Sequence, residues 1–489
     1  MNEGKPMATP NEGPNVMVRR APVAALVAIL VTALVASSCS VSGAGETARK
    51  TDNRSKHTTT SSDRGPSTTT SAGPKPPPVK IVHDDGGPVD AVINQAIGEL
   101  QKWWSTELPK VYDMPYEPVD GGFYSYDSNS AGLPPCATSV RQISGNAYYC
   151  GRRDVVAWDN ERLMPALRQA FGEFTVAVVL AHEWGHAIQS RTHYPSTTTV
   201  TREHQADCFA GAWVGHVNQG GTSFTIGSEK IDKALAGFLA LRDEPGVSAT
   251  SRSAHGTGFD RVSAFEDGFA DGAARCKEYR DGDPSLLELA FNNRVGRNRS
   301  ASLGFDAAVT AGLADLEDYW SKAYPQVFGG QWRPLADARP FDSKSSPSCG
   351  GSNVEMFSLF YCVDDDYVGY DTEELRKIYD KTGDYAIMAL LATQYGMAVL
   401  HRQGGKVVGL TASLRADCYA GAWAASLFLQ NRDTSLDLSA ADLDDGVAAL
   451  LVFRATGDRE RQGPGFLRIK AYRAGLLGGV RACAKVTAG

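Results

Sequence analysis

The chain has 489 residues, of which 42% are hydrophobic, and it carries a formal net charge of −7 at neutral pH. This length is enough for two or three folded domains, each with a sizeable core. The mildly acidic balance, with no basic domain anywhere in the chain, argues against nucleic acid as a partner.

Residues 1–38 are typical of a targeting segment rather than of a folded domain. Two arginines, Arg19 and Arg20, precede an apolar stretch that ends in small residues and is short for a membrane span. The Cys that follows resembles a bacterial lipoprotein cleavage site, at which Cys39 would become the lipidated first residue. We therefore expect an exported protein, lipid-anchored on the outer face of the cytoplasmic membrane, or secreted if Cys39 is not lipidated.

The next segment, residues 39–83, is poor in apolar residues and rich in Ser, Thr, Pro and Lys. Such a composition cannot bury a core, so we expect a disordered tether. Its basic residues outnumber its acidic ones, which allows either simple solvation or weak attraction to an anionic membrane surface.

Short strands and helices are expected to follow, in a mostly helical α+β fold. We predict helices near residues 89–104, 203–217 and 262–276, and a helix start at the acidic turn 159–161. Val155–Trp158 should form a strand. This strand is either a simple core element or the place where an extended substrate is held by backbone hydrogen bonds.

The chain is organised around a metal-binding pattern, His182-Glu183-Trp184-Gly185-His186, which an apolar run precedes. Residues four apart share one face of a helix, so His182 and His186 can bind the same ion. Glu183 stands beside them and can act as general base on a metal-bound water. The HExxH pattern is short and also occurs by chance, but a buried helix would not carry these three groups without partners for them.

A second pattern downstream completes the proposed site. A hydrolytic zinc site needs three protein ligands and an open position for water, and Glu203 can be the third ligand. Asp207 lies one helical turn later and can accept the other ring N–H of a ligating His. His204 lies about 100° round the helix, and we expect it at the surface. The alternative pattern HExxHxxGxxH fails, because Gln189 and Thr192 occupy its Gly and last His positions.

The folded part of the chain contains one unit twice, here called the first copy (84–280) and the second copy (304–489). LAHEWGHAI at Leu180–Ile188 is matched by LATQYGMAV at Leu391–Val399, and QADCFAGAW at Gln205–Trp213 by RADCYAGAW at Arg415–Trp423. Self-similarity within one chain predicts two tandem domains of the same fold.

The second copy lacks every proposed ligand. Thr393, Gln394, Met397 and Ser413 stand in the places of His182, Glu183, His186 and Glu203, whereas Asp417 and Cys418 persist. Features that both copies share should belong to the fold, and features of the first copy alone should belong to catalysis. We therefore expect a degenerate, inactive second domain and one zinc ion per chain.

The same comparison singles out His255. HGTGFDR at residues 255–261 is matched by QGPGFLR at 462–468, in which the Gly, Phe and Arg positions persist but the His does not. A lone His is more often structural than catalytic. Its loss together with the metal ligands makes His255 a candidate for stabilising the oxyanion.

Nine cysteines are present, and all except Cys39 fall at equivalent places, four in each copy. An even number in an exported chain implies disulfides, whereas a second metal cluster would need a CxxC spacing that does not occur. The short loop favours one pair in each copy, and the remaining two cysteines form the other. The expected pairs are Cys136–Cys150, Cys208–Cys276, Cys349–Cys362 and Cys418–Cys483.

Four segments, HEWGH, EHQADCFAGAW, NAYYC with DVVAWD, and HGTGFDR, together resemble the bacterial neutral zinc metallopeptidase family, which is gluzincin-like. The resemblance covers residues 130–280 well and the second copy weakly. It implies zinc on His182, His186 and Glu203, with Glu183 catalytic. The N-terminus resembles that of actinobacterial lipoprotein peptidases.

The expected function is zinc-dependent hydrolysis of peptides or proteins in the cell envelope by a zincin-like domain, with membrane attachment through the lipid. Two alternatives remain open from the sequence. The chain could be a non-catalytic envelope scaffold whose metal is structural. The second copy could instead be the functional part, as a docking module for substrates or partners.

Overall fold

The computed structural model describes residues 72–196, 198–242, 255–281, 303–345, 347–429, 431–436, 438–453 and 461–488. The expected signal segment, Cys39 and most of the expected tether lie outside these ranges. Within them, no helix combines the length and the apolar character that crossing a membrane requires.

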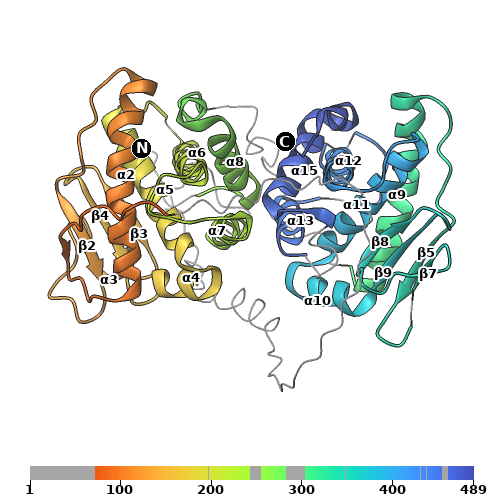
Figure 1. Cartoon of the computed structure of the whole chain (residues 1–489), viewed down its shortest axis with the longest axis horizontal. Helices are drawn as coiled ribbons and strands as arrows, with labels where there is room; N and C mark the ends of the chain where they lie inside the picture. The colour runs from red at the N-terminus through yellow and green to blue at the C-terminus, as the bar shows by residue number, and fades with distance from the viewer. Residues whose placement is uncertain are drawn as a thin grey trace, which may run out of the picture.

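The first copy sets a small mixed sheet beside a group of helices (Figure 1). Strands β2 and β4 run parallel, β1 is parallel to β2, and β3 is an antiparallel edge strand beside β4. The strands are β1 (Ile81–Val82), β2 (Gly122–Tyr126), β3 (Ala147–Cys150) and β4 (Val155–Asp159). The helices are α2 (Pro88–Tyr112), α3 (Val140–Ile143), α4 (Leu163–Phe171), α5 (Glu173–Arg191), α6 (Thr199–Asn218), α7 (Ser228–Ala240) and α8 (Gly258–Cys276).

The second copy repeats this order of elements. Its three-stranded sheet has the order β5-β9-β8, with β5 parallel and β8 antiparallel to β9, as β2 and β3 are to β4. The strands are β5 (Asp337–Phe341), β6 (Ser348–Cys349), β7 (Ser352–Asn353), β8 (Leu359–Cys362) and β9 (Tyr367–Asp371). The helices are α9 (Phe305–Phe328), α10 (Thr372–Thr382), α11 (Asp384–Arg402), α12 (Leu410–Phe428), α13 (Ala440–Val452), α15 (Gly465–Ala482) and the 3-10 turn η2 (Cys483–Lys485). The predicted α+β, mostly helical class is confirmed.

Helix α5 runs through the middle of the first copy and is buried on nearly all its faces. A helix that is apolar all round belongs in a core, which explains why its sequence shows no one-sided pattern. Gly185 lets α6 approach closely, because a Cβ there would lie 2.7 Å from the Cα of Ala206. Gly268 on α8 meets the backbone of α6 in the same way, at the carbonyl of Cys208. The three helices are therefore held at backbone contact.

The eight cysteines pair as the sequence predicts. Cys208–Cys276 and Cys418–Cys483 each join the second long core helix of a copy to the end of its last helix, across 68 and 65 residues. Closing loops of this length restricts the unfolded chain and contributes about 4 kcal/mol each in the chain-entropy description.

The ordered part of the first copy begins earlier than expected. Residues 72–83, assigned from composition to the tether, contain β1, and Asn94 of α2 bonds both the N–H and the carbonyl of Val79 at 3.0 and 2.8 Å. Helix α7 was not predicted, and α2 continues past Trp104 to Tyr112. Both segments gain their stability from packing against other helices, which local composition does not reveal.

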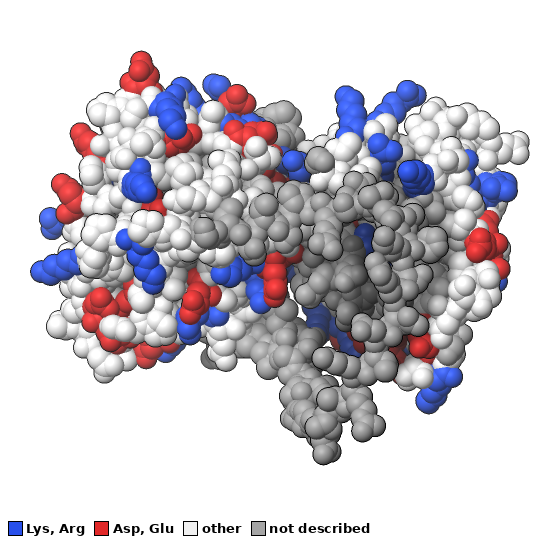
Figure 2. Space-filling view, in the orientation of Figure 1, with Lys and Arg blue, Asp and Glu red and all other residues white. Residues whose placement is uncertain are grey.

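The two copies meet through their last helices, with α7 and α8 facing α13 and α15 across the centre of the molecule (Figure 1). Most of the buried apolar residues that the structure describes form one cluster that continues through both copies, and a small separate cluster lies at the sheet of each copy. Acidic and basic side chains are intermixed over the face of the first copy that Figure 2 shows.

Candidate metal centre

Helices α5 and α6 bring His182, His186 and Glu203 together at the centre of the first copy. One donor atom from each lies within 4.8 Å of the others. Nε2 of His182 is 3.2 Å from one carboxylate oxygen of Glu203, and Nε2 of His186 is 3.4 Å from the other. The two imidazole rings are nearly perpendicular, at 89°. Both rings therefore present Nε2 to the same carboxylate.

These distances suit a tetrahedral ion. Donors bound at about 2.1 Å in tetrahedral geometry lie roughly 3.4 Å apart. Two imidazoles and one carboxylate are a donor set that catalytic zinc uses, with a fourth position left for water or substrate. The donor types and their spacing therefore fit zinc.

His182 is oriented by a buried acid–base pair. Its Nδ1 lies 2.7 Å from Asp207, one turn beyond Glu203 on α6. Arg261 of α8 donates to the same carboxylate from Nε at 2.9 Å and from Nη2 at 2.8 Å. This arrangement fixes the ring and its tautomer, and leaves Nε2 for the ion. The sequence shows an Arg at this position in both copies, Arg261 and Arg468, but it does not indicate that Arg261 contacts Asp207.

His186 has an orienting partner that the sequence motifs did not reveal. Its Nδ1 lies 3.0 Å from Oε1 of Gln189, whose amide donates to the carbonyl of Arg202 at 2.6 Å. The second copy has Leu400 at the position of Gln189. The replacement of Gln189 by Leu400 could have revealed this partner from the sequence. Like the proposed ligands, the polar residue is present in the first copy and absent from the second.

The cluster of His182, His186, Glu203 and Asp207 stabilises positive charge. Burial lowers the pKa of His182, but Asp207 and Glu203 outweigh it and raise that pKa to about 10. For Glu203, burial acts upward, but the two imidazoles hold its pKa well below the ordinary value. Burial also opposes ionisation of Asp207, yet Arg261 and His182 bring its pKa down to about 2. Two ionised carboxylates around two imidazoles form a cation site.

Glu183 lies on the sheet side of α5, beside β3. Its side chain is buried, and one oxygen accepts the backbone N–H of Tyr149 at 3.0 Å. Tyr149 itself donates its hydroxyl to Asp154 at 2.7 Å. The carboxylate is therefore held next to the donor cluster by an edge strand.

The strand expected to hold substrate is not Val155–Trp158. That segment forms β4, which pairs with β2 on one side and β3 on the other, so its backbone groups are used inside the sheet. The sheet order ends at β3, whose outer edge faces α5. Sequence alternation cannot distinguish a central strand from an edge strand, because both are apolar here.

His204 is buried, contrary to the expectation of a surface position. An added Cβ at Gly256, whose φ is +92°, would run into its ring. The loop before α8 therefore packs on α6 next to Glu203. His255 precedes Gly256 in this loop and is partly buried. Its role in stabilising an oxyanion stays a prediction.

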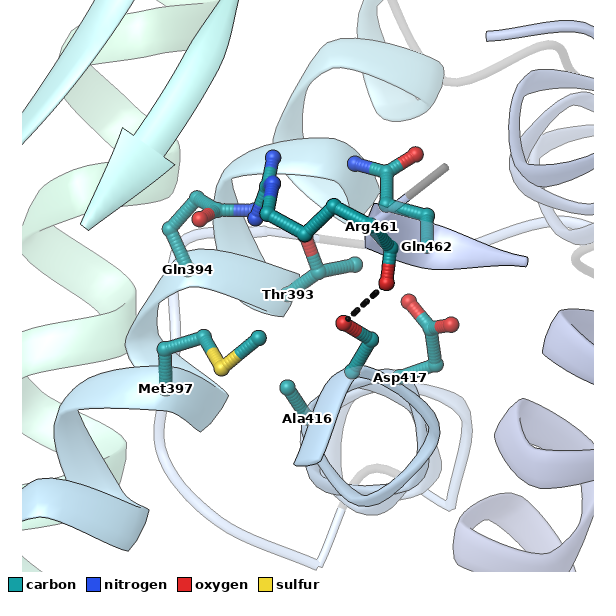
Figure 3. Close-up of a pocket in the computed structure, with 8 residues that line it drawn as sticks. Thr393, Gln394, Met397, Ala416, Asp417, Arg461 and Gln462 are labelled. Carbon is teal, nitrogen blue, oxygen red and sulfur yellow. Dashed lines mark hydrogen bonds between the residues drawn. The ribbon is translucent and has the colours of Figure 1, made fainter. Parts of the chain in front are cut away.

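The same place in the second copy holds no comparable donors (Figure 3). Thr393, Gln394, Met397 and Ser413 line a cavity of about 10 Å³, which is room for one water molecule. Arg461 reaches over Gln394, and its guanidinium donates to the carbonyl of Leu359 at the edge of β8 at 2.7 Å.

Comparisons with known proteins bear on the first copy. Residues 129–279 match the family model described as "Putative neutral zinc metallopeptidase". Two curated relatives, each named "Uncharacterized protein YpfJ", come from Escherichia coli strain K12 and Escherichia coli O6:H1 and are 30% identical over 132 residues. Each match covers 22% of this chain and 45% of the relative, so the chain spans less than half the length of these relatives. No solved structure matches the chain.

The matched residues 129–279 include α5, α6 and α8, and with them every residue of the metal centre described above. The family match indicates a zinc-dependent peptidase at the level of the family. It does not extend to the N-terminal segment, so the resemblance to lipoprotein peptidases stays a prediction.

Proposed function

We propose, from the family match and the spacing of the donors, that the first copy hydrolyses peptide bonds with one zinc ion on His182, His186 and Glu203. The observation that carries the proposal is the convergence of both Nε2 atoms on the Glu203 carboxylate, 3.2 and 3.4 Å away, beside the buried Glu183. Asp207 and Gln189 leave those two ring nitrogens available.

Zinc, when bound, lowers the pKa of a coordinated water and polarises a scissile carbonyl. The chain supplies the proton transfers. The Glu183 carboxylate, buried beside the donor cluster, is assigned to take the proton of the attacking water and to pass it to the leaving amine. The N–H of Tyr149 occupies one carboxylate oxygen and holds the side chain in place, which leaves the other oxygen for the proton.

Substrate orientation is assigned to β3. Its inner edge pairs with β4, and the outer edge runs beside α5 and Glu183. An extended peptide can add to such an edge through main-chain hydrogen bonds, with little dependence on its side chains. This favours peptides and unfolded protein segments over small molecules.

The proposed location is the cell envelope, with Cys39 lipidated and the tether reaching from the membrane to the first copy, or outside the cell if Cys39 is not lipidated. The four disulfides support an oxidising compartment. The second copy is proposed to be a degenerate, inactive domain of the same fold.

The test is cleavage of a broad peptide library by wild type and Glu183→Gln. This variant gives the first copy the residue that the second copy has at Gln394. It should keep zinc, because Glu183 is not a ligand, and should lose at least about 10³-fold in kcat. Equal cleavage by both proteins would remove Glu183 from the mechanism.

A non-catalytic scaffold is the second candidate. The second copy favours this role, because it keeps the fold of the first copy although it has none of the proposed metal-binding residues. Zinc bound by wild type without cleavage of any library peptide would support this scaffold role.

A further inference from the structure

The second copy contributes a carboxylate to the first copy at the start of α8. The N–H groups of Gly258 and Phe259 donate to the two oxygens of Asp444, at 2.9 and 2.7 Å. Asp444 lies on α13 and is buried. Because the first N–H groups of a helix have no partner within it, this carboxylate caps α8 from another domain-sized unit.

The first copy returns the same contact. The N–H groups of Gly465 and Phe466, at the start of α15, donate to the two oxygens of Asp232 on α7, at 3.1 and 2.8 Å. Asp232 is the fifth residue of α7, as Asp444 is of α13. The copies are therefore joined by two equivalent caps that run in opposite directions.

From Asp444 the contacts lead to the metal centre. One turn into α8, Arg261 grips Asp207, which in turn holds Nδ1 of His182. Arg261 also donates to the carbonyl of Leu241 at 3.0 Å, at the end of α7. The next residue, Arg242, pairs with Asp444 at 3.2 Å. Asp444 thus anchors both elements that position the Arg261 guanidinium.

A second route runs through the loop before α8. Gly256 packs against the ring of His204, and His204 follows Glu203 on α6. The cap at Gly258 fixes where this loop ends. Displacement of the α8 start would therefore disturb both the Asp207 side and the Glu203 side of the donor cluster.

The cap that Asp232 makes on α15 is not connected to a set of metal donors. Downstream of Asp232, Arg468 of α15 grips Asp417 at 3.0 and 3.1 Å, but Thr393 stands where a ligating His would be. Of the two equivalent caps, only the one that Asp444 makes on α8 therefore bears on metal binding.

We propose that Asp444 is a positioning residue for the metal site of the first copy, so that the catalytically degenerate second copy acts as a built-in subunit that completes that site. The proposal rests on the zinc site of the proposed function and gives the second copy a role beyond stability. It requires no ligand in the second copy.

The test compares Asp444→Asn with its mirror variant Asp232→Asn in the full chain, with disulfides intact. Each variant removes one charge from a corresponding helix cap, so both should lower the thermal midpoint. Zinc affinity, measured by competition with a chelator, should fall about tenfold in Asp444→Asn, at the lower end for outer partners of metal ligands. It should change less than about twofold in Asp232→Asn, whose cap leads away from the site.

A second measurement needs no variant. Coupling between sites is reciprocal, so zinc should slow hydrogen exchange at the amides of Gly258 and Phe259 more than at Gly465 and Phe466. Equal zinc affinity in the two variants, or equal protection at the two helix starts, would overturn the proposal. So would the absence of zinc binding. Zinc binding with the expected asymmetry but no peptide cleavage would leave the proposal standing and remove the peptidase function.

Discussion

The two copies share a buried Asp–Arg pair but differ in what they build on it. Asp207 and Arg261 in the first copy, like Asp417 and Arg468 in the second, make the same two-pronged contact between the second core helix and the last helix. Because the pair persists where no metal ligand remains, it belongs to the fold. His182 contacts a carboxylate that the architecture holds in place in both copies, so the proposed site depends on few residues beyond those of the fold.

The two copies also differ at the corresponding edge strands, β3 and β8. Leu359 of β8 holds the register position of Ala147 in β3, since each pairs with the matching residue of its central strand. In the second copy Arg461 bonds the carbonyl of Leu359, and Ser413 bonds the carbonyl of Arg461 at 2.9 Å. The second copy therefore lacks the donors, and Arg461 occupies a carbonyl at the edge that corresponds to the proposed peptide-binding edge of the first copy.

The largest effect should come from a ligand. His182→Ala removes one of three donors, so tight zinc binding and peptide cleavage should both be lost. Asp417→Ala, in the second copy, should leave one zinc per chain. Metal analysis of purified protein with intact disulfides decides this, and two zinc ions per chain would show that the second copy also binds metal.

His255 tests the proposed oxyanion role. If its side chain stabilises the developing charge, His255→Ala should lower kcat by about 10²–10³ with zinc content unchanged. Gln462→Ala, the matching change in the second copy, should leave kcat as it is. Loss of zinc or of folding in His255→Ala would assign His255 a structural role instead.

Glu266 places an acidic residue at an interface position where the second copy has a basic one. It stands where the second copy has Arg473, and burial raises its pKa to about 8, opposed by Arg473 and Lys470. The folded chain therefore holds this proton more tightly than the unfolded chain. Glu266 should make stability fall as pH rises from about 4.5 to about 8, and the loss should persist above that.

The variant Glu266→Gln should flatten this pH dependence and raise the free energy of unfolding above pH 8, by at most about 5 kcal/mol for a pKa raised from 4.5 to about 8. Urea unfolding at several pH values measures it. An unchanged slope would mean that the Glu266 carboxyl has the same pKa in the folded and unfolded chains.

The smallest effect should come from Gln189→Leu, which introduces the residue present at Leu400. Without the Gln189 amide, the ring of His186 loses its orienting bond, and zinc affinity should fall about tenfold. Peptide specificity should not change, because Gln189 faces Arg202 rather than the strand edge. Unaltered zinc affinity would show that packing alone orients His186.

Features that depend on short spacing or on self-similarity could be predicted from the sequence. A four-residue spacing decides which side chains share a helix face, so the sequence alone groups His182 with His186. The internal repeat separated ligand positions from fold positions, and the cysteine pattern gave the disulfide pairs.

Which helix packs against which could not be predicted from the sequence, because contacts between distant segments leave no local periodicity. Arg261 reaches Asp207 across 54 residues, and Asp444 reaches Gly258 across 186. His204 is buried rather than exposed because the loop at Gly256 covers it, and β3 rather than β4 forms the edge because of the order of strands in the sheet. Each of these depends on packing between elements, which the sequence specifies only through the whole fold.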